Sequence, residues 1–98
     1  MSALRFEWDP KKAAANERKH GVTFDEDTTV FSDDHGVLLD DPDHADDEDR
    51  FLLLGLSANL RTVVVCHAYQ AAEDVIRLIS ARKATKRERG AYARGWEP

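Results

Sequence analysis

The chain of 98 residues contains a single cysteine, Cys66, so it cannot form an internal disulfide and is expected in a reducing compartment. Cys66 ends the apolar run of residues 63–65, and a core position explains it better than a role as nucleophile. No apolar run approaches the roughly 20 residues that span a bilayer, and no charged-then-apolar leader precedes Phe6. These absences predict a cytoplasmic protein without membrane contact.

Lysine and arginine are absent from residues 25–49, a segment with twelve carboxylates and two histidines. Such a density suggests a metal site, with candidate ligands Asp33, Asp34, His35, Asp40, Asp41, Asp43 and His44. The carboxylates follow no fixed ligand spacing, however, so a solvated acidic loop is the better interpretation. We therefore predict neither a metal ion nor another cofactor.

The formal net charge of −5 conceals a division of charge along the chain. Residues 1–60 hold six basic and fifteen acidic side chains, whereas residues 61–98 hold eight basic and four acidic ones. The C-terminal part can attract an anion such as RNA, and the acidic part can attract a basic protein. Because the whole chain is negative and its basic part is small, we expect the chain by itself to bind DNA poorly at physiological salt.

The length allows one domain, residues 1–98, with a modest core. A short strand is expected at residues 4–8, followed by a helix that Asp9 caps and Pro10 begins. That helix should end at Gly21, the expected left-handed cap. Thr23 and Glu26 form a capping-box pattern that opens a second short helix, ending near residue 31.

The second half of the chain has the apolar and alternating patterns of strands, and it ends in a basic helix. Strands are expected at residues 36–39, 51–56, 61–69 and 75–82, and the helix at residues 84–92. Short connections between the last three strands favour antiparallel hairpins. The predicted class is α+β, with a single antiparallel-rich sheet, helices packed on one face, and the order β-α-α-β-β-β-β-α.

Four groups of residues occur in a consistent order along almost the whole chain: Phe6 to Lys11, Asn16 with Lys19 to Phe24, Asp41 and Pro42 with His44, Glu48 and Arg50, and Ile76 to Ala84. Together they resemble the BrnT toxin family. The resemblance implies a RelE-like fold and a ribonuclease that arrests translation as part of a type II toxin–antitoxin system. It also implies a BrnA-like antitoxin partner with a ribbon-helix-helix DNA-binding part.

Alternation in the strand at residues 61–69 places Arg61, His67 and Tyr69 on one face. If the helices cover the other face, which carries Cys66, this row is exposed and the neighbouring strand can add Arg77. A cation, an imidazole and a phenol in one row suit an RNA groove.

Metal-independent RNA cleavage needs a base for the 2′-hydroxyl, cations for the charge that develops on phosphorus, and an acid for the leaving oxygen. The candidates for charge stabilisation are Arg61, Arg77, Arg82 and Lys83. His67 is the candidate acid or base, because imidazole titrates near neutral pH, with Glu48 or a deprotonated Lys83 as substitute bases. RNA-binding candidates are Tyr69 and Tyr92 as stacking platforms and the helix cations Lys86, Arg87 and Arg89.

Each candidate has a structural alternative. His67 is also explained as a partly buried histidine that a carbonyl satisfies, and Arg77 and Arg82 as partners of Glu48 or Asp49.

Two other functions stay open from the sequence. Gln70 stands where an arginine is common in the family, which together with the acidic 25–49 segment favours a weakened toxin that mainly serves as antitoxin partner and co-repressor. A metal-dependent hydrolase is the third function. The sequence leaves cleavage specificity, ribosome dependence and complex stoichiometry open.

Overall fold

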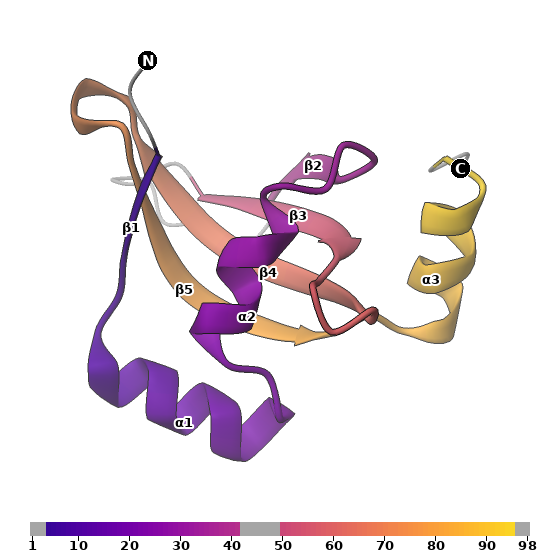
Figure 1. Cartoon of the computed structure of the whole chain (residues 1–98), viewed down its shortest axis with the longest axis horizontal. Coiled ribbons are helices and arrows are strands. Elements are labelled where there is room, and N and C mark those ends of the chain that lie inside the picture. Colours follow the sequence, from indigo (N-terminus) through magenta and orange to yellow (C-terminus); the bar gives the residue numbers. More distant parts are fainter. Residues whose placement is uncertain (1–3, 42–49, 96–98) are drawn as a thin grey trace.

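The computed structural model describes residues 4–41 and 50–95. In chain order its elements are β1 (Arg5–Glu7), α1 (Pro10–His20), α2 (Phe24–Val30), β2 (Val37–Asp40), β3 (Arg50–Leu56), β4 (Thr62–Gln70), a 3-10 turn (Ala71–Glu73), β5 (Val75–Lys83) and α3 (Lys86–Ala93). Within the described residues the strands form one five-stranded sheet in the order β1-β5-β4-β3-β2 (Figure 1). Only the β1–β5 pair of this sheet is parallel. The predicted α+β class is confirmed.

Helix α1 has the ends that the sequence predicts. The Asp9 carboxylate accepts a hydrogen bond from the backbone N–H of Lys11 at 2.8 Å. Gly21 adopts a left-handed conformation with φ 70°, and its N–H donates to the carbonyl of Glu17. Inside the helix the buried Asn16 donates to the carbonyl of Val22 and accepts from the N–H of Ala81 in β5, both at 3.0 Å. One amide thus fixes α1 and the chain that leaves it against the sheet.

Apolar side chains cover both faces of the sheet. The larger cluster joins α2 and the segment before it to one face through Val22, Phe24, Val30, Leu53, Val63, Val65, Ile76, Leu78 and Ala81. A smaller cluster on the opposite face contains Leu54, Val64 and Ala84, with Val37, Leu52 and Tyr92 of α3 packed against it. We call these the helix-covered face and the open face.

The prediction that all helices pack on one face is therefore wrong. Figure 1 shows α2 in front of the sheet, α1 below it, and α3 standing apart from both at the other side of the sheet. The cause is that residues 52–54 and 63–65 are continuous apolar runs, so alternate residues place apolar groups on both sides of the sheet. Helix α3 supplies the second cover.

A register shift interrupts the pairing of β4 with β5. Cys66 lies opposite Ser80, but the next residue, His67, lies opposite Leu78, so β5 has one extra residue at this point. The shift keeps His67 on the helix-covered face beside Leu78. It also pairs Ala68 with Arg77, which places the Arg77 side chain on the open face.

Asp27 in α2 is a carboxylate enclosed by the helix-covered core, with 0% of its surface exposed. Within the described residues neither of its side-chain oxygens has a hydrogen-bond partner. Burial, and next the charge of Glu26, raise the pKa of Asp27 to about 7. The raised pKa means that protonated Asp27 is tolerated in the core, whereas its ionised form opposes folding.

We expect Asp27→Asn to make the protein relatively more stable as the pH rises. In wild type, the stability that protonated Asp27 permits is present at low pH and is lost as the pH rises through the folded-state pKa near 7. Relative to wild type, the unfolding free energy of the variant should increase by roughly 2 to 3 kcal/mol between pH 5 and pH 8. Urea denaturation at both pH values measures this, with the exposed Asp25→Asn as control. A difference that does not change with pH would contradict it.

Candidate functional site

The open face of the sheet gathers polar side chains from its three central strands. Across β3, β4 and β5, Arg50 lies opposite Ala68, which lies opposite Arg77. The next row ends in Ser80, opposite Cys66, and the third in Arg82, opposite Val64. Arg77 and Ser80 are exposed, and Arg82 is partly exposed. The arginines on β5 therefore share one surface.

A buried carboxylate adjoins this surface. Asp41 follows β2 and is only 8% exposed, its N–H donates to the carbonyl of Arg50 at 3.1 Å, and one of its oxygens accepts from the Cys66 thiol at 3.3 Å. Burial, together with the hydrogen bond to Asp41, raises the pKa of the Cys66 thiol to about 11. The thiol is therefore protonated at neutral pH, which agrees with a packing role.

Arg82 is held by α3. Its guanidinium donates to both oxygens of Glu88, at 2.7 and 3.0 Å. Glu88 also accepts from the N–H of Thr85 at 2.8 Å, the reciprocal half of a capping box. The hydrogen bond to Arg82 is the main cause that lowers the pKa of Glu88 to about 2. Arg82 thus ties the end of β5 to the start of α3, while Glu48 and Asp49, its expected partners, lie outside the described residues.

Cations continue along α3 from Arg82. Residues 77–94 contain seven lysines and arginines and one carboxylate. Lys86, Arg87 and Arg89 are all exposed, and Arg89 also donates to the carbonyl of Ala84 at 2.8 Å. Cations in the first turn of a helix oppose its dipole, so local helix stability does not account for Lys86 and Arg87. Together with Arg77 and Arg82 the α3 cations form what we call the cationic strip.

His67 lies away from this strip, in the helix-covered core. It is 4% exposed and meets Phe31 edge to face, with ring centroids 4.9 Å apart. Its Nδ1 lies 3.2 Å from the carbonyl of Val65, which fixes the proton on that nitrogen. Burial lowers the pKa of His67 below its usual value. The surroundings of His67 therefore match the structural alternative, a buried histidine whose ring N–H donates to a carbonyl.

The prediction that Arg61, His67, Tyr69 and Arg77 form one exposed row is therefore wrong. Helices α1 and α2 cover the face on which His67 lies, and the register shift after Cys66 sends Arg77 to the opposite face. Period-two alternation holds along β4, but it does not say which side the helices take.

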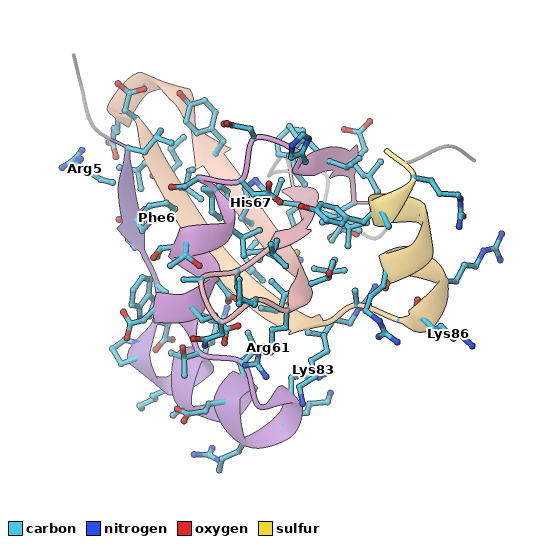
Figure 2. The ribbon with its side chains drawn as sticks, turned by 45° about the vertical axis from the view of Figure 1, so that its right-hand side comes forward. Arg5, Phe6, Arg61, His67, Lys83 and Lys86 are labelled. Atoms are coloured by element: carbon cyan, nitrogen blue, oxygen red, sulfur yellow. The ribbon has the colours of Figure 1, made fainter. Side chains whose placement is uncertain are left out.

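Arg61 and Lys83 lie together near the end of α1, apart from Lys86 of the cationic strip (Figure 2). Arg61 donates to Glu26 at 2.7 Å and to the carbonyl of Gly21 at 2.8 Å. The hydrogen bond to Arg61 is the main cause that lowers the pKa of Glu26 to about 2. Ser57 also donates to Glu26, at 2.7 Å. Arg61 thus has an evident structural role, joining α2 to the β3–β4 turn.

The two tyrosines considered for base stacking have fixed hydroxyl groups. Tyr69 is 43% exposed and donates to Asp74 at 3.0 Å. Tyr92 donates to Asp33 from α3, and burial, then this bond, raises its pKa to about 12. The ring of Tyr92 packs in the smaller apolar cluster, so Tyr69 is the more accessible of the two. Glu48, the substitute base, lies outside the described residues.

In the described part of the chain no group of three or more histidine, cysteine, aspartate or glutamate side chains is placed to hold a metal ion. Asp43 and His44, two of the candidate ligands, fall outside that part. No helix in residues 4–41 and 50–95 is long and apolar enough to cross a membrane.

Comparison with known families identifies the chain. Residues 8–88 match the model of a family described as the ribonuclease toxin BrnT of a type II toxin–antitoxin system. The chain belongs to the BrnT toxin family. The resemblance drawn from the sequence motifs is thereby confirmed.

A solved relative has the same fold. The chain is similar to the 1.1 Å crystal structure of the Brucella abortus ribonuclease toxin BrnT, with a TM-score of 0.62 and 23% sequence identity. The match covers 86% of this chain and 100% of that one. A comparison of the sequence with curated proteins finds no significant match.

Sequence reasoning gave no part in RNA binding or cleavage to three residues of the open face: Asp41, which it considered as a metal ligand, Arg50 and Ser80. All three lie within the motifs that carry the family resemblance. The register of β3, β4 and β5 shows that Arg50 and Ser80 share a face with Arg77, and the hydrogen bond from Cys66 places Asp41 beside them. Their position in those motifs was the available signal.

Replacing His67 with phenylalanine tests its assignment to the core. We expect His67→Phe to cleave RNA at the wild-type rate per folded molecule, because the ring fills the same apolar space and no substrate reaches it. Loss of a true general acid or base costs about 10²- to 10⁴-fold in rate. Single-turnover cleavage at several pH values measures the effect, with thermal unfolding to establish the folded fraction. A fall of that size in a folded variant would return His67 to the active site.

Proposed function

We propose that this chain is an endoribonuclease toxin that binds RNA along the cationic strip, cleaves it and arrests translation. The observation that carries the proposal is the cationic strip, in which Arg77, Arg82, Lys86, Arg87 and Arg89 lie along β5 and α3 of a member of a ribonuclease toxin family. Guanidinium groups match phosphate geometry, and phosphate contacts supply most of the affinity for RNA. The proposal includes a RelE-like fold in the order β-α-α-β-β-β-β-α, which the element order supports.

The chemistry proposed is attack of the 2′-hydroxyl on the adjacent phosphorus, with departure of the 5′-oxygen. Arg77, on the open face, stabilises the charge that develops on the phosphoryl oxygens. Arg82, further along β5 on the same face, adds a second guanidinium group. Asp41, a carboxylate on that side of the sheet, takes the proton of the 2′-hydroxyl. The bond from phosphorus to the 5′-oxygen breaks, and the departing 5′-oxygen takes a proton from water. Glu48 is the second candidate for this role, and Lys83 for charge stabilisation.

The proposed partner is a BrnA-like ribbon-helix-helix antitoxin, encoded with the toxin. It neutralises the toxin by covering cations that RNA would contact, and its own basic part binds operator DNA. A type II system supplies a protein antitoxin by definition of the family, and the division of charge along this chain supports the mode of binding.

A second function is a weakened toxin that mainly serves as antitoxin partner and co-repressor. The engagement of Arg82 by both oxygens of Glu88 favours it, because a guanidinium in a bidentate pair must exchange that partner for a phosphate. Gln70 also favours this second function, because a neutral side chain stands where an arginine is common in the family.

The first test replaces Arg77. It is exposed, so Arg77→Ala should stay folded, slow RNA cleavage by about 10²-fold and abolish growth arrest on induction. The matched control is Arg18→Ala, which removes an exposed arginine from α1 and should change neither. Arg77→Ala should also reduce the slope of log affinity against log salt by about 0.7, the value for one phosphate contact on single-stranded nucleic acid. Undiminished cleavage by soluble Arg77→Ala would remove the strip from the active site, and no cleavage by wild type would favour the second function.

A further test concerns metals. Because the proposed site uses fixed guanidinium groups to stabilise charge, we expect cleavage to proceed in excess EDTA at the same rate as in Mg²⁺. Abolition of cleavage by EDTA, with recovery on addition of Mg²⁺, would overturn this mechanism and support a metal-dependent hydrolase.

A further inference from the structure

The helix-covered face contains an apolar groove of about 400 Å³ at the end of the sheet away from α1. Its lining comes from the residue before β1, the end of α2, the α2–β2 connection, β2, β3, β4 and β5. Its large apolar members include Leu4, Phe31, Leu38, Phe51, Tyr69 and Ile76. We call this hollow the apolar groove. Figure 2 shows His67, which also lines it, high on the sheet and apart from Arg61 and Lys83 near α1.

The groove concentrates the exposed apolar side chains of the protein. Leu38 is 60% exposed, Leu4 is 47% exposed and Tyr69 is 43% exposed, so three of the five exposed large hydrophobic residues in the described chain line one hollow. Leu38 projects from β2, the short strand at the edge of the sheet. Apolar groups gathered in this way on a soluble domain mark a surface that another molecule covers.

Carboxylates border the groove. Asp40 is exposed, lies two residues after Leu38 on the same face of β2, and pairs in register with Phe51. Asp74 accepts the hydrogen bond of the Tyr69 hydroxyl at 3.0 Å. These charges repel phosphate, so the groove is unsuited to RNA, and they attract lysine and arginine. The complementary molecule has an apolar stripe flanked by cations.

We propose that the apolar groove binds an amphipathic helix of the antitoxin, with its apolar side chains against Leu38 and Phe51 and its lysines or arginines beside Asp40 and Asp74. Helices of this kind present apolar residues at positions i, i+3, i+4 and i+7, and they dock in hydrophobic grooves. The proposal takes the identity of the partner from the proposed function, and it does not depend on RNA cleavage.

The location of the groove gives the antitoxin a contact that RNA does not share. Arg77 and Arg82 lie on the open face, whereas Leu38, paired with Leu53, lies on the helix-covered face. The antitoxin is anchored at the groove, and a separate segment of it covers the cationic strip. Variants of the groove should therefore release the toxin without impairing its activity.

The test replaces Leu38 with aspartate. Because Leu38 is 60% exposed, the variant should fold, and circular dichroism and the melting temperature establish this. The matched control is Leu60→Asp, in the β3–β4 turn, where the side chain is 81% exposed and lines no groove with Leu38. The probe is the cognate antitoxin, co-expressed with this chain and then separated from it. We expect Leu38→Asp to weaken antitoxin binding by at least about 30-fold in calorimetry, the effect of a hot-spot residue, and Leu60→Asp to leave Kd unchanged.

A second variant tests the carboxylates that border the apolar groove. Asp40→Asn should weaken binding by a smaller factor and reduce its dependence on salt, because it removes one carboxylate from the edge of the contact. Leu38→Asp should retain the wild-type rate of RNA cleavage and should escape neutralisation in cells.

Three results would overturn the proposal. One is an unchanged antitoxin Kd for folded Leu38→Asp. Another is a dimer of the free chain that Leu38→Asp dissociates while antitoxin binding persists, which would make a second copy the occupant. The third is a loss of RNA binding by Leu38→Asp without loss of antitoxin binding. Failure of the proposed function has a different signature, since wild type would then cleave no RNA while Leu38→Asp still lost the antitoxin.

Discussion

The central strands β3 and β4 are apolar on both faces, and the positions of the three helices follow from this. A strand of alternating character needs cover on one side only, but residues 52–54 and 63–65 place apolar groups on both. Helix α2 and the segment before it cover one side, and α3 covers part of the other. Helix α3 does not cover the whole open face, and the uncovered part carries polar residues such as Arg77 and Ser80. The candidate site lies on this uncovered part.

The register shift between β4 and β5 then decides which residues can act together. Without the extra residue in β5, Arg77 would lie on the same side as Leu78 does now, over the helix-covered core. A buried arginine there would need a partner, and none of the apolar residues of that cluster provides one. With the shift, His67 packs against the ring of Phe31, and the Arg77 side chain is exposed to solvent.

Local features of the fold were predictable because they depend on neighbours in the sequence. The Asp9 cap, the Gly21 turn and the Thr23 cap all form within four residues of the chain, and each is present. The second half of the capping box expected at Thr23 does not form, because the Glu26 carboxylate accepts from Arg61 and Ser57. The class of the fold and the family were also accessible, since motifs spread along the chain carry them. The cations of the strip were named from the sequence, but their arrangement was not accessible. It depends on which face the helices cover and on one shift of register, and neither leaves a local signal. Arg82 illustrates this: no pattern in the sequence predicted its pair with Glu88, which organises the start of the last helix.

The chain separates its charges in space as well as in sequence. The cationic strip lies along the open face and α3, whereas the carboxylates Asp40 and Asp74 border the apolar groove of the other face. A single surface that served both RNA and antitoxin would make them compete for the same contacts, and any substitution would change both affinities. With two surfaces, the affinity for the antitoxin can be tuned at the groove while the arginines stay fixed for phosphate. In the acidic segment of residues 25–49, Asp40 is the carboxylate that this proposal places beside the antitoxin.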